Sequence, residues 1–106
     1  MLLGVFTVQR NILKQKYEAK VYEQDSAARS LEAVTKQIEE ITNAAGSTTN
    51  YKNSDVYKSL VAYQSVYDTK KDQLKLEMDV LKAQIDNCEK AIDEGIKENT
   101  SWSIFG

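Results

Sequence analysis

The chain has 106 residues, of which 42% are hydrophobic and 28% are charged. This composition fits one small folded domain and is too apolar for an intrinsically disordered segment. Fourteen basic and sixteen acidic residues give a formal net charge of −2, and neither half of the chain is strongly biased in sign. Nothing in this balance predicts nucleic-acid binding, and we expect a single domain over residues 1–106.

The location of the protein is indicated by its first residues and its cysteine content. The apolar stretch at residues 1–8 precedes the first basic residues, which is the reverse of the order in a secretory signal. It is also far shorter than the ~20 residues of a membrane-spanning helix. Because Cys88 is the one cysteine, no internal disulfide can form. We expect a cytoplasmic protein, or one exported without a cleaved signal peptide.

The first half of the chain has the apolar spacing of a long helix. Proline is absent throughout, so no such residue interrupts a helix. Apolar residues at steps of three and four predict a helix over about residues 5–45. This first stripe consists of Phe6, Leu13, Tyr17, Ala27, Leu31, Val34, Ile38, Ile41 and Ala45. Lys20 and Gln24 interrupt it, and a break near Gln24 is the alternative to the continuous helix that we favour.

A turn and a second helix follow. Turn-forming residues are dense between residues 46 and 54, where Gly46 suits the left-handed position after a helix end. Ser54 or Asp55 can accept hydrogen bonds from the first amides of the next helix. A second apolar stripe predicts a helix over about residues 55–99, followed by an apolar tail at 100–106. The stripe consists of Tyr57, Leu60, Tyr67, Leu74, Met78, Leu81, Ile85, Cys88 and Ile92.

Reversal of the chain at the turn pairs residues that are equally distant from it. Ile38 then meets Leu60, and Leu13 meets Ile85, so apolar side chains face each other along one seam. Polar interruptions such as Lys20 and Gln24 can fix the register of a seam at a cost in stability. The sequence therefore predicts an all-α fold, a coiled-coil-like antiparallel two-helix hairpin, which self-association completes into a larger helical bundle.

The predicted hairpin brings the two apolar chain ends together. Leu2, Leu3, Val5 and Phe6 come from one end, and Trp102, Ile104 and Phe105 come from the other. On one interpretation the tail folds back onto the helices and closes the seam. On the other it is a docking surface, because concentrated apolar exposure marks interaction sites, and its alternating pattern could add a strand to a partner's sheet.

A further apolar line on the later helix lies beside the predicted seam and consists of Leu76, Val80 and Ala83. One interpretation is that these are isolated exposed residues, which are normal on protein surfaces. The other is a lateral contact that builds a four-helix dimer or a larger array. We favour the lateral contact.

The residues that usually carry catalysis or bind metals are scarce. The sequence has no histidine, and therefore lacks the usual proton shuttle and the commonest metal ligand. Cys88 lies on the apolar stripe, where a buried structural thiol is expected. The acidic residues are spaced as solvated helix-face charges. We expect no enzyme, no catalytic, metal-binding or cofactor-binding residue, and no small-molecule substrate.

Two families of small helical hairpins share features with the chain. Leu60, Gln64, Tyr67 and the Lys-rich and Ile-rich stretch after them loosely resemble the later helix of type III secretion needle and rod subunits, although the proline-containing turn of needles is absent. The length and hairpin form are similar to those of the Trp-x-Gly proteins of signal-less bacterial secretion, but the turn here has no tryptophan. No family is assigned, and the resemblance implies only a tendency to assemble.

The sequence thus predicts a non-catalytic structural or assembly protein. Its hairpins would self-associate into an oligomer or filament through lateral apolar faces and the apolar terminal end. The alternative is a coiled-coil adaptor, a chaperone or a signal-less secretion-apparatus subunit that binds another helical protein through that end. Attachment to a membrane surface through Leu2, Leu3 and Phe6, with basic residues nearby, is the least favoured role.

Overall fold

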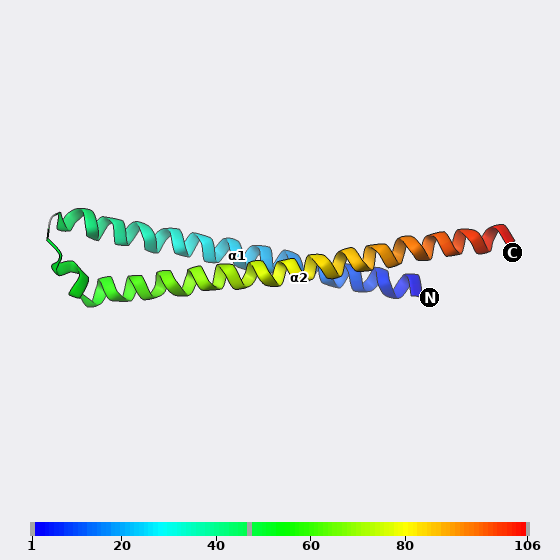
Figure 1. Cartoon of the computed structure of the whole chain (residues 1–106), viewed down its shortest axis with the longest axis horizontal. Coiled ribbons are helices and arrows are strands. Elements are labelled where there is room, and N and C mark those ends of the chain that lie inside the picture. The colour runs from blue at the N-terminus through cyan, green and yellow to red at the C-terminus, as the bar shows by residue number, and fades with distance from the viewer. Residues whose placement is uncertain (1, 47, 106) are drawn as a thin grey trace. The chain divides into compact units, whose positions relative to one another are not determined.

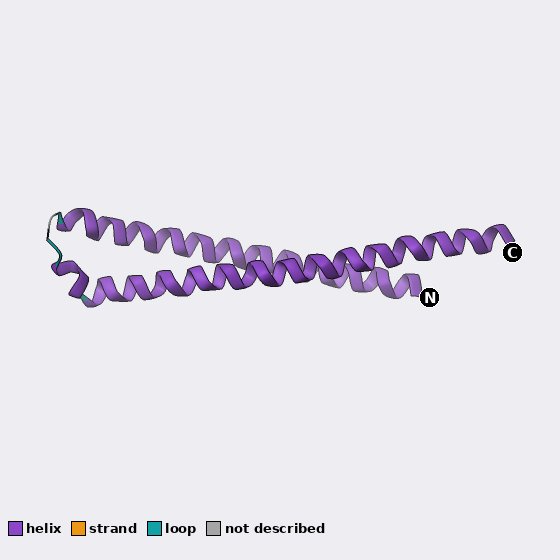
Figure 2. Cartoon of the chain, viewed as in Figure 1, coloured by secondary structure: helices purple, strands orange, loops and turns teal. Residues whose placement is uncertain are grey.

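The chain folds into two long antiparallel helices. The computed structural model describes the backbone of residues 2–46 and 48–105 and the side chains of residues 4–46 and 48–96. Helix α1 spans Leu2–Ala45, the 3-10 helix η1 spans Asn50–Asn53, and helix α2 spans Asp55–Phe105 (Figures 1 and 2). The predicted fold class, an all-α antiparallel helical hairpin, is confirmed.

The hairpin divides into two compact units. The turn unit, Tyr22–Lys75, contains the end of α1, the connection and the start of α2. The terminal unit consists of Met1–Val21 and Leu76–Gly106, and therefore contains the beginning of α1 and the end of α2. The assignment of one domain to residues 1–106 stays a prediction.

The connection has the local chemistry that the sequence predicts. Gly46 has a φ of +62°, the left-handed conformation that glycine adopts without a steric penalty at a helix end. The backbone amide and the hydroxyl of Thr48 both donate to the carbonyl oxygen of Ala45, at 3.2 and 2.8 Å. At the start of α2, the Ser54 hydroxyl accepts from the amide of Tyr57 at 3.1 Å. Side chains thus satisfy backbone groups at both helix ends.

The seam of the turn unit combines apolar packing with two amide hydrogen bonds. Ala27 and Leu74 are each 4% exposed. The side-chain amide of Gln64 donates to the Thr35 hydroxyl at 3.2 Å, and that of Gln24 donates to the backbone carbonyl of Lys71 at 3.4 Å. Helix α1 is continuous at Gln24, as favoured from the sequence. Its polar side chain finds a partner across the seam, so no helix break is needed.

The seam of the terminal unit contains residues of both predicted stripes. Ile85 and Ile92 are buried, at 9% and 8% exposure, while Phe6, Leu13 and Tyr17 are half-buried. Two ion pairs cross between the helices. Lys20 Nζ lies 2.9 Å from Glu77 Oε2, and Lys14 Nζ lies 3.3 Å from Glu89 Oε1. These contacts fix the antiparallel register of this unit.

The end of α2 differs from the prediction. We expected the helix to end near residue 99 and an apolar tail to follow, either folded back or extended, but α2 continues to Phe105. No proline or glycine lies between residues 96 and 105, so nothing stops the helix once it has formed. In Figure 1 the last turns of α2 extend beyond the beginning of α1, so the tail does not fold back over the seam.

Two neighbouring leucines of α2 test the seam. Leu74→Ala should lower the free energy of unfolding by about 2–4 kcal/mol, because Leu74 is buried. Leu76→Ala is the matched control: Leu76 is 66% exposed, and its truncation should change stability by less than about 0.5 kcal/mol. Urea unfolding followed by circular dichroism at low protein concentration measures both. Equal losses would contradict the assigned helix faces.

Two glycines test the turn. Gly46→Ala should cost about 1 kcal/mol, because its positive φ is unfavourable for a residue with a Cβ atom. Gly4→Ala is the control, since Gly4 lies in α1 with open space around the added Cβ, and alanine there should be neutral or stabilising by a few tenths of a kcal/mol, roughly. Thermal unfolding compares the two variants. A stabilising Gly46→Ala would show that the left-handed turn is not the folded conformation.

Candidate protein-interaction surface

The predicted partner-binding residues fall into three groups in the structure. Leu76, Val80 and Val5 are exposed, at 66%, 59% and 51%. Phe6 is half-buried and belongs to the seam of the terminal unit. The side chains of Leu2, Leu3, Trp102, Ile104 and Phe105 lie outside the described residues, so their role in an apolar terminal end stays a prediction.

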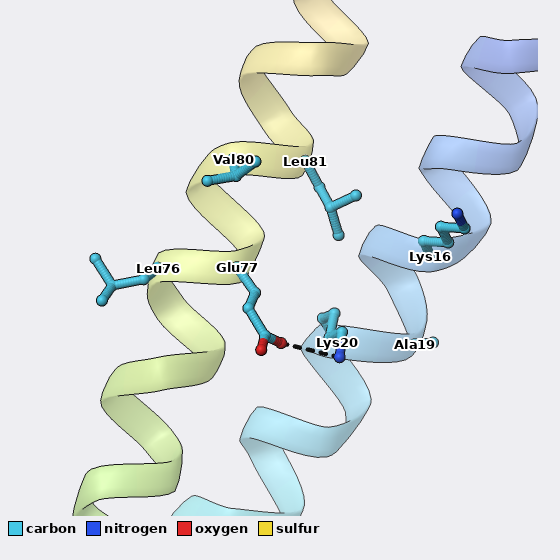
Figure 3. A pocket seen from close by; sticks show the side chains of 7 residues that line it. All are labelled: Lys16, Ala19, Lys20, Leu76, Glu77, Val80 and Leu81. Carbon is cyan, nitrogen blue, oxygen red and sulfur yellow. Dashed lines mark ion pairs between the residues drawn. The ribbon is translucent and has the colours of Figure 1, made fainter.

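One apolar edge runs along α2 in the terminal unit. The α2 edge consists of Leu76, Val80 and Ala83, which recur at steps of four and three and therefore share one helix face. All three are exposed. Figure 3 shows Leu76 and Val80 pointing away from α1, whereas the neighbouring Leu81 points toward it. The exposure expected of this line from the sequence is confirmed.

A second apolar edge runs along α1 in the same unit. The α1 edge consists of Val5, Val8, Ile12 and Ala19, and its first three members are 51%, 57% and 47% exposed. Ala19 also lines a groove together with Leu76 and Val80 of α2. This edge is not among the features predicted from the sequence, because the first apolar residues are interpreted there as a chain end. The signal was the three- and four-residue spacing, offset from the seam stripe that contains Phe6 and Leu13.

A shallow groove lies between the two helices of the terminal unit. Its apolar lining consists of Leu81 together with Leu76 and Val80 of the α2 edge and Ala19 of the α1 edge. The ion pair of Lys20 with Glu77 crosses it (Figure 3). A neighbouring groove is lined by Ile12, Leu13 and Cys88, and Lys16 lines both grooves. Two helices leave such a groove open to solvent on one side. Its shape and apolar lining suit another helix better than an enclosed small molecule.

The surface of the terminal unit presents apolar side chains next to the charged side chains of Lys16, Lys20 and Glu77. Cys88 is half-buried and lines one of the grooves.

Within residues 4–46 and 48–96, no three His, Cys, Asp or Glu side chains are grouped so as to hold a metal ion. Across the described part of the chain, no helix is long and apolar enough to cross a membrane. The absence of catalytic activity stays a prediction.

The turn unit also exposes apolar side chains. Val66 and Tyr63 on α2 are 59% and 56% exposed, and Tyr22 on α1 is 78% exposed. Val66 lines a shallow depression together with Thr69 and Gln73. Apolar exposure is therefore not confined to the chain ends and the α2 edge, where the sequence predicts it.

Comparisons with known proteins assign no relative. No protein-family model matches the chain, and no match was found among curated proteins or among solved structures. Any functional conclusion therefore depends on the surfaces of this chain itself.

The ion pair across the groove can be tested by a double-mutant cycle. Lys20→Met, Glu77→Gln and the double variant should give a coupling energy of about 0.2–1 kcal/mol that decreases with added salt, because both side chains are partly exposed. Asp25 with Arg29, one turn apart on α1, is the matched control and should couple by a few tenths of a kcal/mol, roughly. No coupling between Lys20 and Glu77 at low salt would contradict the described register.

Proposed function

We propose that this protein is a non-catalytic assembly subunit, a helical hairpin that self-associates through the exposed apolar faces of its helices. The observation that supports the proposal is the imbalance between buried and exposed apolar side chains. Among the described residues, four hydrophobic side chains are buried, whereas twelve large hydrophobic side chains are exposed. Scattered exposure is ordinary, but exposure that exceeds the core is not.

The energetics of a two-helix fold support association. Ordering each residue costs about 1–2 kcal/mol of conformational entropy, which burial of apolar surface must offset. One seam between two helices buries little surface, and small folds of this kind commonly gain stability by oligomerisation. Packing the exposed edges against further helices would supply the missing burial.

The form of the exposed surface favours a helical partner. The α1 edge and the α2 edge are straight lines of small and branched apolar residues along helices, as in the contacts of helical bundles. A second copy of the chain carries complementary surfaces and is present whenever the protein is made. We therefore propose self-association, with an adaptor role toward another helical protein as the alternative.

Light scattering coupled to size-exclusion chromatography tests this proposal. The wild-type chain should show a mass above 12.0 kDa that rises with concentration. Val80→Lys should raise the apparent dissociation constant at least about tenfold, because association would bury an unpaired charge. Ser59→Lys is the matched control, since it adds the same charge to an exposed position of α2 in the turn unit, outside the α2 edge.

Two results would contradict self-association. One is a wild-type chain that stays at 12.0 kDa up to high micromolar concentration while circular dichroism shows it folded. The other is equal weakening by Val80→Lys and Ser59→Lys, which would show that added charge and not the α2 edge controls the mass. A monomeric chain that binds another helical protein through Val80 would favour the adaptor role.

A further inference from the structure

We infer that neighbouring copies associate through unlike edges, with the α1 edge of one copy packed against the α2 edge of the next. This inference rests on the proposed self-association and specifies its partner and symmetry. A second copy is the occupant of each edge.

The two edges border the same side of the terminal unit. Leu76 and Val80 of the α2 edge line one groove together with Ala19 of the α1 edge, and Ile12 of the α1 edge lines the neighbouring groove. In Figure 3, Leu76 and Val80 point away from α1, whereas Leu81 points toward it. One copy cannot cover either edge with its own helices in this unit. Each copy therefore presents two separate apolar lines to its surroundings.

The helices that carry these edges have opposite charge. Residues 4–21 of α1 contain four basic side chains and one acidic side chain, a net charge of +3. Residues 76–96 of α2 contain six acidic and two basic side chains, a net charge of −4. Lys16 follows the α1 edge, whereas Asp79 and Asp86 follow the α2 edge, and all three are exposed. The formal charge of −2 for the whole chain hides this separation.

The charges of the two helix segments favour one of the three possible contacts between copies, which are α1 with α1, α2 with α2, and α1 with α2. Pairing α1 with α1, or α2 with α2, would bring like charges together along the contact, which costs free energy and slows association. Pairing α1 with α2 brings a basic helix to an acidic one. The ion pairs of Lys14 with Glu89 and of Lys20 with Glu77 show the same attraction within one copy. An unlike contact between copies would repeat this pattern.

The shared groove side indicates the symmetry of the unlike contact. When the groove sides of two copies face each other, the α1 edge of each copy packs against the α2 edge of the other, which is an isologous interface of four helices. An unlike contact made only once by each pair of copies would instead be heterologous and would produce a ring or an open array.

Two single-edge variants test the inference. Ile12→Glu blocks the α1 edge and Val80→Glu blocks the α2 edge, and both positions are exposed, at 47% and 59%, so each monomer should remain helical. Each variant alone should stay at 12.0 kDa, because every unlike contact would include one blocked edge. An equimolar mixture should form a species of twice that mass and nothing larger. Circular dichroism verifies that both variants are folded.

Specific outcomes overturn the inference without overturning self-association. If wild-type chains associate but Ile12→Glu alone still dimerises, α2 pairs with α2. If Val80→Glu alone still dimerises, α1 pairs with α1. A mixture that stays monomeric, with an associating wild type, also excludes the unlike contact. If the wild type itself never associates, the proposed function fails first.

Salt provides a second readout on the wild-type chain. Contact between a basic and an acidic helix should weaken as ionic strength rises, because counterions screen the attraction. Contact between like-charged helices should strengthen under the same conditions. Measuring the dissociation constant at low and high sodium chloride distinguishes the two, and a dissociation constant that falls with salt would overturn the inference.

Discussion

A pair of helices has one shared seam, and each helix must bury its apolar side chains there or leave them in water. In the terminal unit the seam buries Ile85 and Ile92, and in the turn unit it buries Ala27 and Leu74. Most other seam residues are only half-buried, because no third element covers the sides of the pair. Limited burial is therefore a property of the fold, and it explains why so much apolar surface remains accessible.

Polar residues set the register of this narrow seam. Gln64 and Gln24 each bond across the turn unit, and Lys20 and Lys14 form ion pairs across the terminal unit. Each bond contributes little free energy by itself, but a shift of register would leave these groups without partners. Apolar side chains of similar shape can pack in more than one register, so an apolar stripe specifies the register of the two helices only weakly. The polar contacts therefore add specificity to a seam that provides modest stability.

The opposite charges of the two helix segments connect folding with the proposed assembly. A basic α1 segment and an acidic α2 segment attract each other within one copy, which favours the closed hairpin. The same attraction acts between copies wherever an exposed α1 segment meets an exposed α2 segment. One pattern of charge thus favours the fold and supports the inferred contact between neighbours.

The sequence by itself determined the two helices, the turn and the seam, because helical periodicity, the absence of proline and the signals at Gly46 and Ser54 act over a few residues. It misplaced the end of α2, since weak helix formers such as Trp102 and Ile104 do not stop a helix that has no breaker. Only the tertiary structure decided that Gln24 bonds across the seam to Lys71 and that Lys20 pairs with Glu77. Those outcomes depend on the side of each helix that faces its partner, and a pattern along one chain does not specify that relation.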